Sequence, residues 1–328
     1  MPRMRYDVPR PVVILSVIGT TFGVTVLIKD KYGGKKYEES TDMFGKTVVI
    51  TGANSGIGKE TAKILSKRGG RVIMACRNMT ACETLRKEIY EMSLNPSIEC
   101  RKLDLSSTES IHSFVDGLKK DGRNVDVLIN NAGMMCGPKN VTDDGFEWQL
   151  GVNYLGPFLL TNLLLDKLKA APQGRIINLV SPFFKRSSVN FEDLNSTKNY
   201  VPKEAYGQSK LALVLFSQEL ARRLEGTRVT VNCVNPGVCK TDIGRHLPVS
   251  QSMFGGLINP LLWVFCKTAF QGAQTPVFLS IDDNLAKTTG KYFTDMKEDQ
   301  LTPNALDEAA AKRLWLISEK WTKLSQET

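Results

Sequence analysis

Residues 47–58 read TVVITGANSGIG, and this stretch decides the fold. Its first five residues, Thr47–Thr51, form a short β-branched run of the kind that makes a buried strand. A turn rich in glycine follows at once, and glycine lets the backbone approach a pyrophosphate closely. The free N–H groups at the start of the next helix can then hold the phosphates. The expected phosphate-binding residues are Gly52, Asn54, Ser55, Gly56, Ile57 and Gly58.

The glycine spacing in this turn is G-x-x-x-G-x-G, which differs from the commoner G-x-G-x-x-G dinucleotide pattern. A tight loop of small residues is the competing interpretation. A strand before the turn and a helical stretch after it favour the dinucleotide site, because the phosphates need both elements.

Strands and helices alternate outward from this stretch. Further strands are expected at residues 71–76, 97–104, 125–130, 175–180 and 229–234. Helices are expected through about residue 68 and at 79–92, 108–120, 145–169 and 204–225. This alternation implies right-handed crossovers and a parallel sheet covered on both faces. The sequence therefore predicts an α/β fold, a doubly wound parallel seven-stranded sheet of Rossmann type, in one domain at 45–328.

An uncharged apolar run lies near the N-terminus at residues 11–28, between Arg10 and Lys29. As a helix it would span about 27 Å, close to the roughly 30 Å hydrocarbon core of a bilayer. A cleaved signal peptide is the alternative, but the following KDKYGGKKYEES offers no small-residue cleavage site. We expect residues 1–28 to be a membrane anchor and 29–44 to be a linker.

Charge and cysteine usage narrow the partners. The net charge is +9, and a cluster of basic residues adjoins the apolar run, namely Lys29, Lys31, Lys35 and Lys36. This position favours anionic lipid head groups as the partner of the basic residues. No nucleic-acid-binding motif occurs, so no nucleic-acid partner is expected. The seven cysteines include no C-x-x-C, so we expect no disulfide framework and a reducing compartment. Neither histidine has zinc-site spacing, and no metal is expected.

The end of the second expected strand indicates which dinucleotide binds. A site for NAD places a carboxylate there for the ribose 2′-OH, but this chain has Cys76 followed by Arg77. Arg77 could pair with the 2′-phosphate of NADP(H), assisted by Lys59. A surface arginine is the alternative. Asp104, at the end of the third strand, is expected near the adenine or as an N-cap of the next helix.

Tyr206-x-x-x-Lys210 is the candidate for proton transfer. Residues four apart on a helix share a face, so the phenol and the ammonium can act at one site. A free phenol has a pKa near ~10, and a nearby Lys⁺ lowers it. The motif is weak alone, because Tyr32-x-x-x-Lys36 repeats the spacing in the expected linker.

The assignment of Tyr206 and Lys210 is supported by further motifs that occur in a characteristic order. Over residues 45–295 the chain resembles the short-chain dehydrogenase/reductase family. The matching features are the turn at 51–58, Asn130-Asn131-Ala132-Gly133, Asn153, Ser181, Tyr206 with Lys210, and Asn235-Pro236-Gly237.

The resemblance implies a role for each matching residue. Tyr206 would exchange a proton with the substrate oxygen, and Ser181 would hydrogen-bond the same oxygen. Lys210 would hold the nicotinamide ribose and lower the pKa of Tyr206. Asn153 would fix a water in the proton relay. The segment that contains Asn131 would support the central strand and line the adenine side.

Within that family the chain resembles the retinol dehydrogenases, in segments such as IMACRN and GFEWQLGVNYLGPFLLTNLLLDKLK. This implies NADP(H)-dependent interconversion of a small apolar alcohol and its carbonyl, retinol and retinal first, with reduction favoured. Other lipid aldehydes or steroid ketones, and an inactive cofactor-binding membrane protein, are the alternatives. The mitochondrial inner membrane is favoured over the endoplasmic reticulum, and a homodimer through the helices at 145–169 and 204–225 is possible.

Two prolines depart from the family pattern. Pro182 restrains Ser181 towards an extended backbone and can place its hydroxyl differently, while Pro157 stands where many relatives have histidine. Residues 243–268 are rich in large apolar side chains and are expected to form a substrate lid or a packed helix that closes the core. Residues 304–325 are expected to form an amphipathic helix.

Overall fold

A computed structural model describes residues 9–32, 34–38, 41–239 and 266–324 of the chain. Its centre is an eight-stranded sheet with the order β3-β2-β1-β4-β5-β6-β7-β8. Seven strands run parallel, which confirms the doubly wound sheet, and an eighth runs antiparallel at the edge. The strands are β1 (Thr47–Thr51), β2 (Arg71–Cys76), β3 (Ile98–Lys102), β4 (Val127–Asn130), β5 (Gly174–Leu179), β6 (Val229–Asn235), β7 (Lys291–Thr294) and β8 (Lys297–Asp299).

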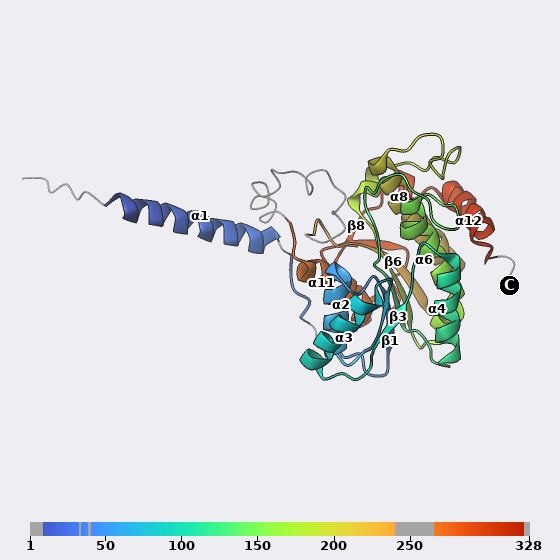
Figure 1. Cartoon of the computed structure of the whole chain (residues 1–328), viewed down its shortest axis with the longest axis horizontal. Coiled ribbons are helices and arrows are strands. Elements are labelled where there is room, and N and C mark those ends of the chain that lie inside the picture. The colour runs from blue at the N-terminus through green and yellow to red at the C-terminus, as the bar shows by residue number, and fades with distance from the viewer. Residues whose placement is uncertain (1–8, 33, 39–40, 240–265, 325–328) are drawn as a thin grey trace, which may run out of the picture.

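Helices cover both faces of the sheet (Figure 1). One face carries α2 (Gly56–Lys67), α3 (Met79–Ser93) and α11 (Ala269–Ile281). The other carries α4 (Thr108–Lys120), α6 (Gly156–Leu163), α7 (Leu165–Ala170), α8 (Pro202–Arg223) and α12 (Glu308–Thr322). Short 3-10 turns lie at Pro182–Arg186, Asp283–Leu285 and Pro303–Ala305.

The core forms one apolar cluster on each side of the sheet, and β1 supplies both. Val49 belongs to the cluster under α4, α6 and α8, whereas Val48 and Ile50 belong to the cluster under α2, α3 and α11. Every residue of β1 is buried, because a parallel strand with helices on both faces has no solvent side. This explains why the strand reads as a continuous apolar run.

The helix expected at residues 145–169 is interrupted. It begins as α5 (Trp148–Leu150), continues as a π-helix at Gly151–Leu155, and only then becomes α6 and α7. Pro157 accounts for the irregularity, because proline has no N–H with which to bond the carbonyl of Asn153 one α-helical turn earlier. In the π-helix the backbone hydrogen bonds join residues five apart instead of four, so the helix is locally wider at Asn153.

The C-terminal helix α12 packs on α8 and closes one side of the molecule. The ring of Trp315 lies 5.1 Å from that of Phe158 and 5.7 Å from that of Phe216, and Arg223 stacks on Trp315 at 4.0 Å. Most of α8 is buried in consequence. The two helices through which the family resemblance implied a homodimer thus both contact α12 of the same chain.

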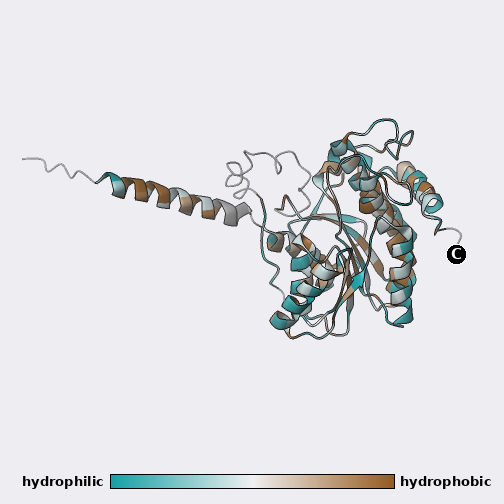
Figure 2. Ribbon diagram, viewed as in Figure 1, coloured by the Kyte–Doolittle hydropathy of each residue, from teal (hydrophilic) through white to brown (hydrophobic). Residues whose placement is uncertain are grey.

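The apolar N-terminal run forms α1 (Arg10–Tyr32), which extends beyond the uncharged run at 11–28 and continues into the expected linker. Its window Arg10–Leu27 has a mean hydropathy of 1.7, and none of it is buried in the protein. Figure 2 shows the apolar character along this helix. Thr20, Thr21 and Thr25 donate their hydroxyl protons to carbonyls four residues earlier, so their polar groups are satisfied within the helix.

One disulfide corrects the sequence interpretation. Cys82, in the first turn of α3, is bonded to Cys100 of β3, while the other five cysteines are free. The expectation that no disulfide forms was wrong for this pair. The two residues are 18 positions apart, and only the packing of α3 back onto β3 brings them together.

We predict that Cys100→Ser lowers the free energy of unfolding by about 3 kcal/mol, because the closed loop of 18 residues restricts the unfolded chain. Urea unfolding with and without dithiothreitol measures the effect. The reductant should destabilise the wild-type protein by the same amount and leave the variant unchanged. Equal stability of the oxidised and reduced wild-type protein would contradict the prediction.

Candidate active site

The sequence-predicted residues gather at the carboxyl ends of the parallel strands. The order of the sheet reverses between β1 and β4, since β1 is followed by β2 on one side and β4 on the other. Crevices at such a reversal are where doubly wound sheets bind ligands. The glycine turn follows β1, Asn131 follows β4, and Ser181 follows β5.

The glycine turn is shaped so that side chains are excluded. Gly52 has a φ of +63° and Gly56 a φ of +53°, conformations that favour glycine. A Cβ atom on Gly58 would lie 2.5 Å from the carbonyl oxygen of Gly52 and 2.5 Å from Nδ2 of Asn131. Glycine at these positions lets the turn fold tightly against Asn131, which sets the shape of the loop that a pyrophosphate would meet.

Asn131 and Thr51 latch this turn to the next strand. The Asn131 amide donates to the carbonyl oxygens of Thr51 (2.9 Å) and Gly52 (3.2 Å). In return, the Thr51 hydroxyl accepts the backbone N–H of Asn131 (3.0 Å) and of Ala132 (2.9 Å). Asn131 was expected to bind cofactor, but its amide is engaged with the turn, so the structure assigns it to positioning the phosphate loop.

The start of α2 fits an anion. Its N-cap, Ser55, makes no side-chain hydrogen bond to the first turn, whereas the N-caps of α3, α4, α11 and α12 all do. Ser55 is exposed, and Asn54 and Ile57 are partly so. The first N–H groups of α2 are thus available to phosphate oxygens, and they carry the positive end of the helix dipole.

Arg77 stands exposed beyond the end of β2, with 56% of its side chain accessible. Its Nε lies 4.0 Å from Oδ2 of Asp104, so these two predicted residues are brought together. Lys102, which the sequence did not single out, donates to the Arg77 carbonyl at 2.7 Å. Lys59 was expected to help, but it is paired with Glu88 at 3.0 Å.

The position at which NAD sites carry an acid holds the thiol of Cys76. It is fully buried, and burial raises its pKa to about 11, against hydrogen bonds from the backbone of Ala53 and Asn54 that lower it. A neutral thiol there presents no charge to a 2′-phosphate. Arg77 and Lys102 therefore supply the positive charge here, with the carboxylate of Asp104 4.0 Å from the guanidinium.

Asp104 does not cap the following helix. Its Oδ1 accepts the backbone N–H of Ser106 at 3.0 Å and the Ser106 hydroxyl at 2.6 Å. The N-cap of α4 is Ser107, whose hydroxyl accepts the N–H of Ser110. The capping alternative is therefore wrong, and the remaining carboxylate oxygen of Asp104 faces Arg77.

Tyr206 and Ser181 meet across α8 and β5. Tyr206 is 3% exposed, and burial raises the pKa of its phenol to about 12, while a hydrogen bond with Ser181 lowers it. Ser181 has φ −139° and ψ 146°, the extended backbone that Pro182 imposes. Its hydroxyl nevertheless reaches Tyr206, so the proline has not separated the two.

Lys210 lies one turn along α8 and is also buried. Its Nζ donates to the carbonyl of Leu179 at 3.0 Å and lies 6.0 Å from the centre of the Tyr206 ring. Burial lowers the pKa of Lys210 to about 8, against the Cys233 thiol nearby, which raises it. The net shift of the Tyr206 pKa is upward, opposite to the shift expected from Lys210, because desolvation of the phenol dominates.

Asn153 lies in the π-helix with its side chain fully bonded. Its Nδ2 donates to the carbonyl of Met134 and to the hydroxyl of Ser209, both at 2.9 Å, and its Oδ1 accepts the Met134 N–H at 2.9 Å. Ser209 in turn donates to the carbonyl of Tyr206 at 2.7 Å. Asn153 thereby ties the segment after β4 to the helix that carries Tyr206.

Gln149 and Phe183 also shape the site, although the sequence interpretation missed them. The ring of Phe183 meets that of Tyr206 edge-on at 5.5 Å. Gln149 is completely buried, accepts the N–H of Cys136 at 2.7 Å, and donates to the Tyr200 hydroxyl at 3.0 Å. These partners come from three separate segments, so no local pattern could have identified them.

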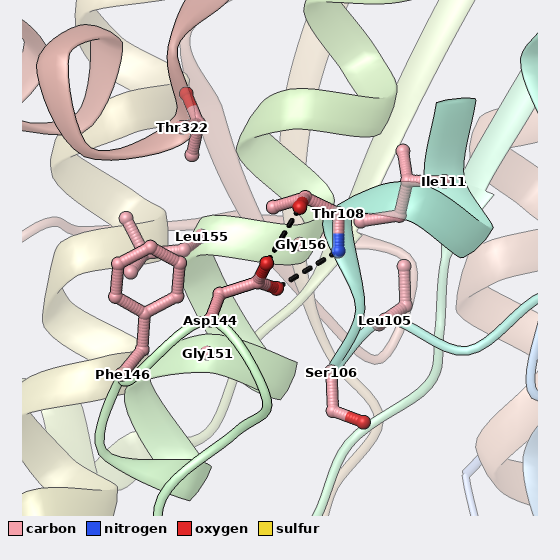
Figure 3. A pocket seen from close by; sticks show the side chains of 10 residues that line it. All are labelled: Leu105, Ser106, Thr108, Ile111, Asp144, Phe146, Gly151, Leu155, Gly156 and Thr322. Carbon is pink, nitrogen blue, oxygen red and sulfur yellow. Dashed lines mark hydrogen bonds between the residues drawn. The ribbon is translucent and has the colours of Figure 1, made fainter.

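A shallow hollow near the start of α4 is separate from this site (Figure 3). Asp144 projects into it and accepts the backbone N–H of Thr108 at 2.9 Å and its hydroxyl at 2.6 Å, which fastens the loop before α5 to α4. None of the sequence-predicted site residues lines this hollow. Most of the expected lid at 243–268, namely residues 243–265, lies outside the described residues.

Comparison with known proteins agrees with this geometry. A family model for the short chain dehydrogenases matches residues 46–251. The chain therefore belongs to the short-chain dehydrogenase family, and membership makes it an oxidoreductase.

Its relatives include several retinol dehydrogenases. The chain is 48% identical to retinol dehydrogenase 13 of Mus musculus over 95% of this chain and 94% of that protein. It is 45% identical to retinol dehydrogenase 14 of Mus musculus, over 84% and 86% of the two chains. Retinol dehydrogenase 12 of Bos taurus shares 41% identity over 93% and 95%.

Solved structures share the fold. An uncharacterized protein from Mycobacterium Paratuberculosis has a TM-score of 0.72 at 34% identity, covering 88% of this chain and 98% of that one. A short chain dehydrogenase from Shigella flexneri 2a, complexed with NADP, has a TM-score of 0.62 at 21% identity, covering 79% and 100%.

We predict that Gly58→Ala raises the Kd for NADPH by at least about tenfold, or about 1.4 kcal/mol. The added Cβ would meet the Gly52 carbonyl and the Asn131 amide at 2.5 Å and displace the phosphate loop. Fluorescence titration with NADPH measures the effect. Gly117→Ala in α4 is the matched control, because the nearest atom to its Cβ is 3.8 Å away. An unchanged Kd for Gly58→Ala contradicts this account of the turn.

Proposed function

We propose that the protein is an NADP(H)-dependent oxidoreductase that interconverts an apolar alcohol and its carbonyl. The preferred substrate pair is retinol and retinal, and the favoured direction is the reduction of retinal. The observation that carries the proposal is the group of Ser181 with the buried Tyr206 and Lys210, at the same edge of the sheet as the glycine turn. The similarity to retinol dehydrogenases supports the substrate class.

The protonated phenol of Tyr206 suits carbonyl reduction. Its pKa of about 12 keeps the proton on the phenol at neutral pH, ready to be donated to the carbonyl oxygen. The Ser181 hydroxyl stabilises the charge that develops on that oxygen. A bound nicotinamide supplies the hydride that is added to the carbonyl carbon. In oxidation, Tyr206 accepts the alcohol proton instead.

Lys210 and Asn153 complete the proposed proton path. Lys210 holds the nicotinamide ribose, and its charge opposes the high pKa of the phenol when Tyr206 ionises. The side chain of Asn153 is fully engaged, so its backbone carbonyl is the group that can hold a water. Pro157 supports this role, because it cannot donate the N–H that an α-helix would direct to that carbonyl.

Arg77 supports the preference for NADP(H). Its exposed guanidinium, with Lys102 beside it and no acid at the end of β2, offers a charged fork to a 2′-phosphate. Asp104 would turn towards the adenosine when Arg77 leaves it for the phosphate. Gly52 to Gly58 would hold the pyrophosphate.

A membrane location is part of the proposal. The exposed apolar face of α1 needs a lipid environment, and we propose that residues 1–28 anchor residues 45–328 to a bilayer. The mitochondrial inner membrane is preferred, with the endoplasmic reticulum as the alternative. A homodimer through the helices at 145–169 and 204–225 remains part of the proposal, and because α12 packs on α8, α12 would contribute to such an interface.

Turnover of all-trans-retinal with NADPH by the detergent-solubilised protein tests the proposal. We predict that Tyr206→Phe lowers kcat by about 10²–10⁴ while the Kd for NADPH stays within a factor of about two. Tyr90→Phe, at an exposed position of α3, is the matched control. Turnover of only a steroid ketone or another lipid aldehyde would change the substrate. NADPH binding with no turnover of any carbonyl would indicate an inactive cofactor-binding protein.

Tyr206 also gives the wild-type protein a pH signature. Oxidation requires the phenolate, so its rate should rise with pH between about 6 and 8, since the phenol titrates far above this range. Reduction requires the phenol and should stay nearly constant there. Initial rates in both directions provide the measurement. A pH-independent oxidation rate would show that Tyr206 is not the base.

We predict that Arg77→Ala reduces the preference for NADPH over NADH by about 10–100-fold, the value of a lost charge-assisted contact to phosphate. The ratio of kcat/KM values with the two cofactors measures it. Arg86→Ala is the control, because Arg86 on α3 forms an ion pair with Glu83 on the same helix. Equal effects of the two variants would remove Arg77 from the cofactor site.

A further inference from the structure

The segment that joins α1 to the sheet is held against α11 by Tyr37. Tyr37 is 7% exposed, and its backbone N–H donates to Oε1 of Gln274 at 3.0 Å. Its hydroxyl donates to Oδ2 of Asp282 at 3.3 Å, and its ring meets that of Phe278 edge-on at 5.5 Å. We call these contacts the Tyr37 clamp. The expected linker is thus docked at this point.

A second contact lies three residues earlier. A Cβ atom on Gly34 would lie 3.3 Å from Oδ1 of Asp295 and 3.4 Å from Nζ of Lys267, which form an ion pair. Lys267 also packs against Gly237, where an added Cβ would lie 2.9 Å from its side chain. The joining segment therefore touches the part of the molecule where the chain leaves β6 and enters α11.

The clamp leaves a short tether. Helix α1 ends at Tyr32, and five residues at about 3.4 Å each reach at most ~17 Å to Tyr37. If α1 lies in a bilayer, the α11 side of the sheet is confined close to its surface. Figure 1 shows α1 meeting the rest of the molecule beside α11.

The surface next to the clamp carries apolar and basic side chains. Val238, just after β6, is 69% exposed, and Phe270, in the first turn of α11, is 40% exposed. Gln274 connects this surface to the clamp, because its amide donates to the Phe270 carbonyl at 2.8 Å. Lys35 and Lys36, within the joining segment, are also exposed.

We propose that the Tyr37 clamp docks this face of the domain on the bilayer. In this docked state Val238 and Phe270 enter the lipid interface, while Lys35 and Lys36 meet anionic head groups. The proposal rests on the membrane anchoring proposed above. Gly237 ends the Asn235-Pro-Gly segment at the same edge of the sheet as the glycine turn, so the docked face adjoins the edge that carries the candidate site.

The test uses the full-length protein in vesicles of phosphatidylcholine and phosphatidylserine that contain a phosphatidylcholine with a photoactivatable diazirine in its acyl chain. Cross-linked peptides are mapped by mass spectrometry. Label is expected on α1, on the peptide with Val238 and on the peptide with Phe270. Leu316 on α12 is the internal control, because it is 63% exposed on the opposite face of the sheet.

Two variants separate docking from folding. An insertion of about 12 Gly/Ser residues after Tyr32 keeps the clamp intact but lengthens the tether, and label at Val238 and Phe270 should fall about fivefold. Tyr37→Ala should have the same effect, with NADPH binding confirming that it is folded, and Tyr90→Ala should have none.

The outcomes distinguish the two proposals. Label on α1 with no more label at Val238 and Phe270 than at Leu316 overturns docking and leaves anchoring in place. Label at Val238 and Phe270 that is unchanged by the insertion and by Tyr37→Ala shows that the clamp does not hold the domain, and overturns the proposal. Absence of label on α1 overturns the anchoring and with it the docking.

Discussion

Parallel pairing of β1 with both β2 and β4 is the constraint on which the rest of the structure depends. The register aligns Val48 with Val72 on one side and with Val127 on the other, so the strands reach the same edge. The pairing delivers Thr51 to Asn131, and their reciprocal hydrogen bonds fasten the glycine turn. A phosphate loop without that latch would lack a defined shape, and α2 would not direct its free N–H groups into the crevice.

Burial sets the chemistry at the same edge. Desolvation raises the pKa of Tyr206 to about 12 and lowers the pKa of Lys210 to about 8, so at neutral pH the phenol keeps its proton while Lys210 stays charged but loses its proton more readily than a free lysine. A chain of buried hydrogen bonds connects the strands to the helix that carries both groups. The Asn130 amide donates to Oδ1 of Asn178 at 2.8 Å, and the Asn178 amide donates to the Ser217 hydroxyl at 2.8 Å. These hydrogen bonds hold β4, β5 and α8 in one arrangement, which is what a proton-transfer site requires.

Local pattern predicted much of the fold and part of the candidate site. The buried runs of β1 and β2 and the helix of Tyr206 lie where periodicity placed them, because each is a property of neighbouring residues. Contacts between distant segments were missed or misassigned. Lys102 rather than Lys59 adjoins Arg77, since β3 lies beside β2 and Glu88 holds Lys59. The Cys82–Cys100 disulfide was missed for the same reason.

By itself the sequence determined the βα alternation, the glycine turn, the apolar helix α1 and the identity of the groups that can transfer a proton. These features need only the order and spacing of residues along one segment. Only the tertiary structure decided that Asn131 serves the turn, that Asn153 is locked to Met134 and Ser209, and that the joining segment docks through Tyr37. Each depends on a partner far away in sequence, and packing alone determines which partner that is.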